Sequence, residues 1–354
     1  MSSSFTRLCA VVAGTAVALG AALVLPSAAS AAPALPLAAA AVSGTLTITN
    51  ADPAPSNSRV VLNRIQTPVS ANQHFHNKAV LKLSNTGTKT LTITSLATTG
   101  PFTVTPPWAL PIILSAGASA NATVTFVATS GRWWSGNLAI NSTSSAGATA
   151  DVSLAGYWQQ YSEHNLEPSL AELVANFGYK SVIPANTYNR GAYTASPNTD
   201  EVLIPYWTLL DSSKSATVTQ LAAWHGYPST GLFKTFAKGS PSSATTRLTS
   251  LNVDAQSALP LNTAWGKGTA TFTPTGTFGI RVDNESGDPT LNDQTVDRSH
   301  GCTAAQCGYH LRAFKVRGAD SNVIAGKYFF AEDFNGINYD FQDNVYLVDN
   351  IKAG

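Results

Sequence analysis

The sequence predicts an all-β protein in which an immunoglobulin-like sandwich is followed by a larger β-sandwich carrying one helix. About seven short runs with strand character fall within residues 45–156, and clusters of Gly, Pro, Asn or Ser separate them. That spacing is typical of an immunoglobulin-like sandwich. Eight or nine further strand-like runs lie between residues 201 and 351, after a single helical pattern. Many strands with one helix predict a second sandwich.

The N-terminus has the pattern of a secretory signal peptide, residues 1–31. Arg7 precedes an uncharged apolar stretch at 8–25, and Ala29-Ser30-Ala31 forms a small-x-small cleavage pattern. The apolar stretch is close to the roughly 20 residues of a membrane span, which is the alternative interpretation. The cleavage pattern favours export, so we expect a secreted protein, extracellular or associated with the cell wall, with no membrane span after cleavage. An Ala/Pro spacer follows at 32–43.

Charge is sparse and unevenly distributed. Only 12% of the 354 residues are charged and the formal net charge is +1, which argues against nucleic acid as a partner because phosphate binding needs a basic surface. Residues 32–157 contain six Lys or Arg and two acids, whereas residues 158–354 contain 14 and 18. Opposite net charges in the two segments predict two domains that attract each other.

The first segment has clear strand periodicity. Its runs lie at 46–49, 60–65, 79–84, 91–96, 122–128, 137–142 and 150–156. Within the third run Ala79, Leu81 and Leu83 would face one side of a sheet, while Val80 and Lys82 face the other. Residues 44–157 are therefore expected to form the immunoglobulin-like sandwich.

An ordered series of motifs in this segment resembles a known module. LKLSNTGTKTLTITSL at 81–96 is followed by GPF at 100–102, LSAGASANATVTFVA at 114–128, GNLAINS at 136–142 and VSLAG at 152–156. The series is similar to the bacterial immunoglobulin-like modules called choice-of-anchor D, which are related to the abnormal-spindle and hydin family. The resemblance implies a spacer or adhesive unit of an exported protein and brings no catalytic residues with it.

Residues 158–354 are expected to form the second sandwich. Leu170, Leu173, Val174 and Phe177 follow helical spacing and predict the single helix. Strand-like runs follow at 201–210, 216–226, 231–239, 245–251, 269–273, 277–282 and 309–316, before a closing hairpin at 328–351. The order of these pieces resembles C-terminal β-domains of unknown function in large bacterial exported proteins, so the resemblance implies an architecture and no activity.

Two cysteines, Cys302 and Cys307, remain after cleavage of the signal peptide. An exported protein meets an oxidising environment, which predicts a disulfide that closes the short loop CTAAQC. A pair of metal-binding thiolates is the alternative, although structural zinc normally takes four ligands.

The closing hairpin concentrates acidic side chains. Glu332, Asp333, Asp340 and Asp343 fall within 12 positions, around a turn rich in Asn and Gly. Such hard oxygen ligands suit calcium, the one cofactor that the sequence suggests. The alternative is a hydrogen-bonded turn in which these carboxylates accept backbone N–H bonds.

Aromatic residues of the second sandwich suggest carbohydrate binding. Trp207, Trp224, Tyr227 and Trp265 are candidates for a platform on which sugar rings stack. Each of them alone is more often part of a sandwich core.

Together these features favour a secreted, non-catalytic binding or adhesion protein, with a glycan or a cell-surface component as its partner. No catalytic residue is assigned. A polysaccharide hydrolase is the main alternative, because carboxylates are also dense at 283–297 and glycoside hydrolysis needs an acid paired with a second carboxylate. A purely structural spacer or matrix protein is the third interpretation.

Overall fold

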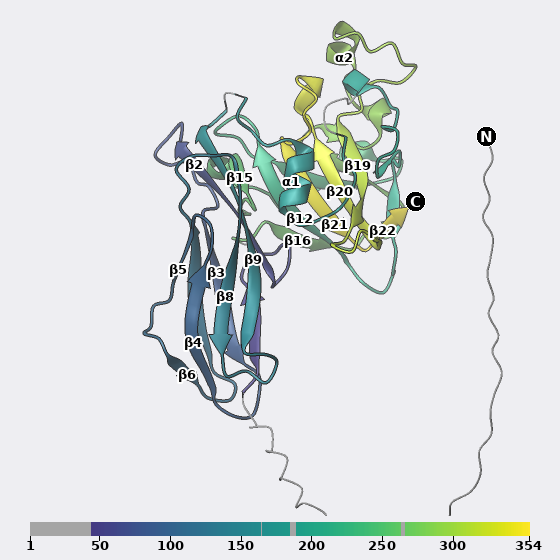
Figure 1. The fold of residues 1–354 in the computed structure, drawn as a ribbon. Helices are drawn as coiled ribbons and strands as arrows, with labels where there is room; N and C mark the ends of the chain where they lie inside the picture. Colours follow the sequence, from purple (N-terminus) through teal and green to yellow (C-terminus); the bar gives the residue numbers. More distant parts are fainter. Residues whose placement is uncertain (1–43, 164, 185–188, 263–265) are drawn as a thin grey trace, which may run out of the picture. The chain divides into compact units, whose positions relative to one another are not determined.

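Four β-sheets form the folded part of the chain (Figure 1). The computed structural model describes residues 44–354 except 164, 185–188 and 263–265. In these residues strands dominate and helices are short, which confirms the predicted all-β fold class. The predicted signal peptide and spacer, like Trp265, lie outside the described residues.

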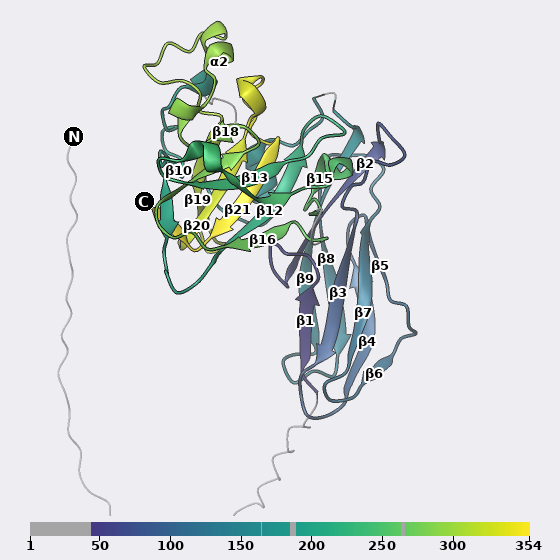
Figure 2. The ribbon, with the colours of Figure 1, turned by 180° about the vertical axis from the view of Figure 1, so that it is seen from behind.

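The first two sheets form the immunoglobulin-like sandwich. One has the strand order β1 (Leu46–Asn50), β3 (Lys78–Asn85), β7 (Ser119–Phe126), β5 (Phe102–Thr105). The other has the order β2 (Arg59–Thr67), β9 (Thr149–Tyr161), β8 (Trp133–Ser142), β4 (Leu91–Thr98), β6 (Ile112–Leu114). The rear view in Figure 2 shows β1, β3 and β7 beside one another. All pairings within these two sheets are antiparallel except β2 with β9.

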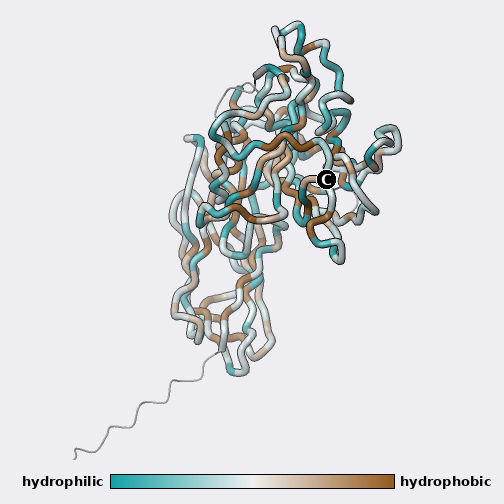
Figure 3. Tube along the Cα trace, turned by 90° about the vertical axis from the view of Figure 1, so that its right-hand side faces the viewer, coloured by the Kyte–Doolittle hydropathy of each residue, from teal (hydrophilic) through white to brown (hydrophobic). Residues whose placement is uncertain are grey.

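The core of this sandwich follows the alternation read from the sequence. Ala79, Leu81 and Leu83 are buried while Val80 and Lys82 are exposed, as expected. Hydrophobic and hydrophilic residues alternate in short stretches along the trace in Figure 3. Burial of one face of each sheet is the main favourable term that holds two such layers together.

The other two sheets form the second sandwich. A seven-stranded sheet contains β10 (Glu201–Val202), β19 (Leu311–Arg317), β20 (Val323–Glu332), β21 (Asn344–Asp349), β12 (Ala216–Trp224) and β15 (Gln256–Ala258), and β16 (Thr269–Phe272) also pairs with β12. A six-stranded sheet contains β14 (Thr245–Thr249), β13 (Leu232–Ala237), β17 (Phe278–Val282), β11 (Trp207–Leu209) and β22 (Ile351–Ala353), and β18 (Glu285–Ser286) also pairs with β17. Their shared core includes Phe233, Phe278 and Tyr346.

Strands β2 and β9 are buried on both faces where the two sandwiches meet. Val60 and Leu62 face the core of the first sandwich, whereas Val61 belongs to a second apolar cluster. Strand β9 repeats this arrangement, with Leu154 in the first core and Tyr157 in the second cluster. The continuous apolar run of β2 is therefore explained by two-sided burial, as in the strands of covered parallel sheets.

Helix α1 (Leu170–Asn176) covers this junction. Leu170, Leu173 and Val174 are buried in the same cluster as Trp224 and Phe329 of the second sandwich. Ser169 caps the helix, since its side chain accepts a hydrogen bond from the backbone N–H of Glu172. In return, the backbone N–H of Ser169 donates to the Glu172 carboxylate. This reciprocal capping box satisfies backbone donors that the first turn leaves free.

Two further features were not expected from the sequence. A one-turn helix, α2 (Thr295–Ser299), precedes the cysteine loop. Strand β9 continues to Tyr161, past residue 157 where the sequence analysis places the domain boundary, so the division at that residue stays a prediction. None of the helices in the described part of the chain has the length and apolar character needed to cross a membrane.

Candidate functional site

The closing hairpin forms as the sequence predicts. Strands β20 and β21 pair antiparallel from Tyr328 with Val348 to Glu332 with Asn344. The intervening segment, residues 333–343, includes Asn335, Gly336 and Tyr339 at positive φ. Asn and Gly tolerate this conformation at low cost, and the turns that it creates bring side chains from both ends of the segment together.

Three of the four predicted metal ligands meet at this turn. Asp333, Asp340 and Asp343 each offer a carboxylate oxygen, and these atoms lie within 4.8 Å of one another. Backbone N–H groups hold two of the carboxylates: Tyr339 donates to Asp333 Oδ1 at 2.8 Å, and Phe334 donates to Asp343 Oδ2 at 2.7 Å. We call these three residues the aspartate cluster.

Two oxygens of the aspartate cluster are buried without a hydrogen-bond partner, Asp333 Oδ2 and Asp340 Oδ1. Burial, and then the neighbouring Asp340 carboxylate, raise the pKa of Asp333 to about 7. Burial and the Asp333 carboxylate raise the pKa of Asp343 well above its usual range. The cluster therefore carries negative charge at a cost that a bound cation would relieve.

The donor set fits a hard divalent cation. Carboxylate oxygens are the ligands that calcium prefers, and the variable coordination geometry of calcium is compatible with a site built on a turn. The cation would supply charge neutralisation and fix the turn, while the three aspartates would hold it. The fourth predicted ligand, Glu332, is not in the cluster: it is the last residue of β20, and successive residues of a strand point to opposite faces.

Glu332 is instead one of the residues that line a cavity of about 870 Å³ next to the hairpin. It is completely buried, and its Oε2 accepts from Asn344 Nδ2 at 2.8 Å while its Oε1 has no hydrogen-bond partner. Gln220 holds Asn344 in turn, because its Nε2 donates to Asn344 Oδ1 at 2.7 Å. Burial and the nearby Asp283 carboxylate raise the pKa of Glu332 well above its usual range.

The cavity brings together segments that are far apart in sequence. Its walls come from the 225–234 region, from the turn after β17, and from the closing hairpin. Residues whose side chains can recognise a ligand there are Glu163, His225, Ser229, Thr230, Lys234, Asp283, Asn284, Glu332, Phe334, Ile337, Asn338, Asp343 and Asn344. Asp343 belongs to both the cavity wall and the aspartate cluster, so the two sites adjoin.

The predicted aromatic platform is not assembled on one surface. Trp207 is buried in the core of the second sandwich, and Trp224 is buried at the junction with the first, where its Nε1 donates to Gln159 at 2.9 Å. Tyr227 is partly exposed on the segment that forms one wall of the cavity. Phe334, which no sequence pattern marks as a candidate, is an exposed aromatic side chain that lines the cavity.

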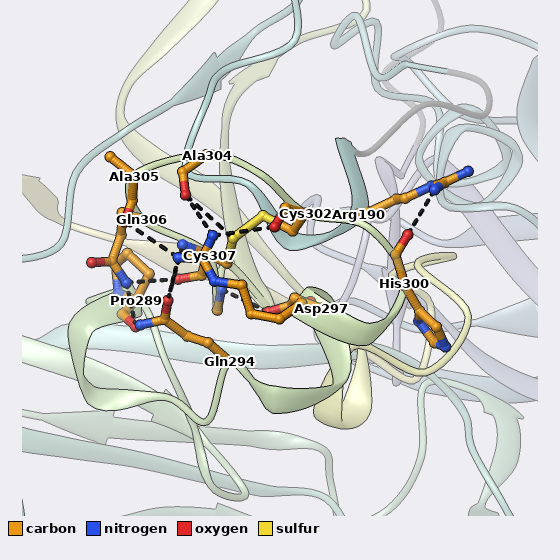
Figure 4. The surroundings of a disulfide bond; sticks show 12 residues. Arg190, Pro289, Gln294, Asp297, His300, Cys302, Ala304, Ala305, Gln306 and Cys307 are labelled. Atoms are coloured by element: carbon orange, nitrogen blue, oxygen red, sulfur yellow. Dashed lines mark hydrogen bonds between the residues drawn. A yellow bond between two sulfur atoms is a disulfide. The ribbon is translucent and has the colours of Figure 1, made fainter.

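Cys302 and Cys307 form a disulfide, as predicted (Figure 4). Arg298 of α2 fills the loop that they close, donating to the carbonyls of Cys302 at 3.1 Å and Ala304 at 2.7 Å. The loop is tied to the closing hairpin through Asp297, whose Oδ1 accepts from the Tyr339 hydroxyl at 2.9 Å. The segment that carries the cysteine loop thus supports the turn that carries the aspartate cluster.

A buried histidine lies beneath the same turn. His310 Nδ1 is 2.6 Å from Glu285 Oε2, and its Nε2 is 3.0 Å from Asp297 Oδ2. Burial lowers the pKa of His310, but the hydrogen bonds to Asp297 and Glu285 outweigh burial and raise it to about 9. With a carboxylate at each ring nitrogen, the imidazolium donates two hydrogen bonds.

The sequence matches no family model and no curated protein sequence. Solved structures that share local similarity include a protein of unknown function from Porphyromonas gingivalis W83, 14% identical, with a TM-score of 0.26; the match covers 35% of this chain and about half, 51%, of that one. The ASH/PapD-like domain 7 of human CEP192 is 14% identical with a TM-score of 0.23, over 37% of this chain and 97% of that domain. The CupB2 chaperone of Pseudomonas aeruginosa is 11% identical with a TM-score of 0.22, over 65% and 93%. These scores support no inference about activity or partners.

Proposed function

We propose that the chain is a secreted, non-catalytic binding or adhesion protein that recognises a glycan or another surface component, with calcium organising its ligand-facing turn. The observation that carries this proposal is the aspartate cluster, which has two unpartnered buried oxygens and shares Asp343 with the wall of the adjoining cavity. A cation there would hold the hairpin turn in the shape that completes the cavity.

The cavity itself favours a ligand-binding role over a purely structural one. Its volume of about 870 Å³ falls within the roughly 300–1,000 Å³ range of small-molecule sites. A few convergent polar groups, among them Asn344 and Lys234, lie beside exposed apolar side chains at the rim. A spacer module has no need of such a hollow.

The predicted export and the choice-of-anchor D resemblance support an extracellular location for the proposed binding. The signal-like N-terminus and the low charge content support it. Calcium is present at millimolar levels outside cells, so an extracellular site of modest affinity would be occupied.

Thermal unfolding of the chain from Ala32, with calcium and with chelator, tests the calcium part. We expect calcium to raise the melting temperature, because a ligand at about 100 times its Kd stabilises the folded state by about 2.7 kcal/mol. Asp340→Asn combined with Asp343→Asn should abolish the rise. The matched control, Asp151→Asn combined with Asp320→Asn, removes the same charge at exposed positions and should keep it. Equal melting with calcium and with chelator would remove calcium from the proposal.

A glycan array probed with the same chain, in calcium, tests the binding part. We expect retention of a defined subset of glycans that chelation weakens. Failure to retain any glycan or any cell-surface preparation would leave only a structural role.

A polysaccharide hydrolase is the second candidate, because Asp283 and Glu332 line one cavity. Burial raises the pKa of Asp283 to about 6, with Glu285 adding to the effect, so this site contains perturbed carboxyl groups of the kind that glycosidases use. Release of reducing ends from polysaccharide, lost in both Asp283→Asn and Glu332→Gln, would establish catalysis. Binding without release would establish the non-catalytic function.

A further inference from the structure

Two acceptor atoms of residues that line the cavity beside the closing hairpin, Glu332 Oε1 and His225 Nε2, have no hydrogen-bond partner. We propose that it binds a hexosamine residue with a free, protonated amino group, as found in a de-N-acetylated polysaccharide. This inference rests on the proposed glycan-binding function and names its site and its ligand class. Glu332 and Asp283 would receive the ammonium group, and the rim of the cavity would contact the sugar ring.

The need for a donor with positive charge follows from the lining residues. Four carboxyl groups, those of Glu163, Asp283, Glu332 and Asp343, face one lysine, Lys234. That lysine already donates to the backbone carbonyl of Asp283 at 2.7 Å. The buried Glu332 Oε1 has no hydrogen-bond partner. Burial raises the pKa of Glu332, so ionisation of this group is costly, and a ligand that places an N–H⁺ donor at its unpaired oxygen would stabilise the ionised form through a hydrogen bond and charge neutralisation.

A neutral imidazole adds a further acceptor position. His225 Nδ1 lies 2.7 Å from Ser229 Oγ, and its Nε2 is buried without a hydrogen-bond partner. Burial lowers the pKa of His225 to about 4, so this ring does not compete with the ligand's charge. A ligand hydroxyl would satisfy the unpartnered nitrogen.

The size and the rim of the cavity favour a sugar over a small amine. A volume of about 870 Å³ far exceeds what an ammonium group fills. Phe334 and Ile337 at the rim are 42% and 59% exposed, which offers apolar surface to the C–H face of a pyranose. Asn284, Asn338 and Thr230 also line the cavity and can bind ring hydroxyls.

Calcium and the sugar would use different oxygens. A cation in the aspartate cluster engages Asp343, which removes one negative charge from the cavity wall, and Glu332 lies outside that cluster. Glu332 and Asp283 then remain for the ligand, with the turn held in place above them.

Isothermal titration calorimetry on the chain from Ala32, in calcium and 150 mM salt, tests the proposal with four probes. They are a glucosamine tetramer, its fully N-acetylated counterpart, cellotetraose and spermidine. We expect the glucosamine tetramer to bind at least tenfold more tightly than each of the others. Equal affinity for the N-acetylated tetramer or cellotetraose would overturn the role of the amino group, and equal affinity for spermidine would overturn the role of the sugar.

Variants locate the site. Glu332→Gln should weaken binding of the glucosamine tetramer at least tenfold, and so should Phe334→Ala, which alters an exposed side chain and is expected to fold. Asp151→Asn, on the first sandwich, should bind as the unaltered chain does. Unchanged affinity in both site variants would overturn this location.

The outcome is separable from that of the proposed function. Retention of acetylated or neutral glycans on the array, together with no glucosamine binding, would keep the glycan-binding function and reject the amino-sugar site. Loss of the calcium effect on melting would reject the calcium role and leave the tetramer titration to decide the site.

Discussion

His310 illustrates how one side chain can hold a turn in place. It is buried beneath the closing hairpin, and each of its ring nitrogens faces a carboxylate, Glu285 on one side and Asp297 on the other. Asp297 in turn accepts from Tyr339 of the turn and from the backbone N–H of Gly308 beside the disulfide. The ion pair between His310 and Asp297 therefore connects the cysteine loop to the turn that carries the aspartate cluster.

The stability contributed by His310 should depend on pH in a defined window. Its pKa is raised to about 9 in the folded state, against about 6.5 in an unfolded chain, so the contribution of about 3 kcal/mol is complete below pH 6.5 and is lost as pH rises through 9. Denaturant unfolding of the unaltered chain and of His310→Gln, at pH 6, 8 and 10, measures it. We expect the difference in free energy of unfolding to shrink as pH rises.

His225→Gln is the matched control for this experiment. The pKa of His225 is lowered to about 4, so its imidazole stays neutral from pH 6 to 10 and its difference from the unaltered chain should be flat. A constant difference for His310→Gln over the same range would contradict the assignment of His310 as an imidazolium.

At the scale of elements, helix α1 shows how a local signal serves a contact between distant segments. Glu172 closes the capping box with Ser169. Its carboxylate also accepts from Nε1 of Trp133, the first residue of strand β8, at 2.8 Å, and from Nη2 of the preceding Arg132 at 3.0 Å. The helix start is thereby fixed to the first sandwich.

Removing the cap should destabilise the chain measurably. Ser169→Ala leaves the Glu172 backbone N–H without its side-chain acceptor, and we expect a loss of about 1 kcal/mol in the free energy of unfolding. Ser242→Ala, at an exposed position, serves as the control and should change stability by less than about 0.5 kcal/mol. Equal stability of the two variants would show that the cap contributes nothing.

Element positions were largely predictable from the sequence, because period-two alternation and turn residues act locally. Leu81 and Leu83 on β3, the α1 pattern and the closing hairpin are examples. Two-sided burial of β2 was not predictable, since Val61 belongs to a buried cluster whose other members include residues of α1, more than a hundred residues later in the chain. The disulfide was predictable because only two cysteines remain after the predicted signal peptide, and an exported chain meets oxidising conditions.

The candidate site was predictable only in part, because a sequence pattern reports local structure and not contacts between distant segments. The aspartate cluster is local, and strand alternation could have separated Glu332 from Asp333 in advance. The meeting of Asp283 with Glu332 depends on how β17 and β20 are placed, which no local pattern contains. Residue type alone suggests Trp207 and Trp224 as ligand-binding candidates, but they are buried in two different cores, which is the commoner use of a large aromatic side chain.

At the scale of the whole molecule, the two sandwiches share polar as well as apolar contacts. Asn63 of β2 is completely buried: its Nδ2 donates to the Gln256 carbonyl at 3.2 Å, and its Oδ1 accepts from the Ala258 N–H at 3.1 Å. The opposite charges expected of the two segments meet in a salt bridge of 3.0 Å between Arg132 and Glu172. That pair is partly exposed, so it contributes at most about 1 kcal/mol.

We expect the described part of the chain to unfold in one cooperative transition, with Asn63 contributing to both sandwiches. Asn63→Ala leaves buried backbone groups of β15 unpaired, which should lower the free energy of unfolding by about 1–3 kcal/mol.

Differential scanning calorimetry measures both the midpoint and the number of unfolding transitions. Asn121→Ala, at an exposed position on β7, should leave the midpoint nearly unchanged. Two separate transitions in the unaltered chain would show that the sandwiches unfold independently.

The continuity of strand β9 also determines where a protease can cut. Two domains joined by an exposed linker are commonly separated by brief digestion, because cleavage needs a segment free to enter the enzyme. Here the chain passes from one sandwich toward the other while paired with β8 over Thr149–Tyr157 and with β2 over Ser153–Tyr161. Release of the two sandwiches by cutting within β9 would require those ladders to open first, so we expect brief digestion to leave the chain in one piece at this junction.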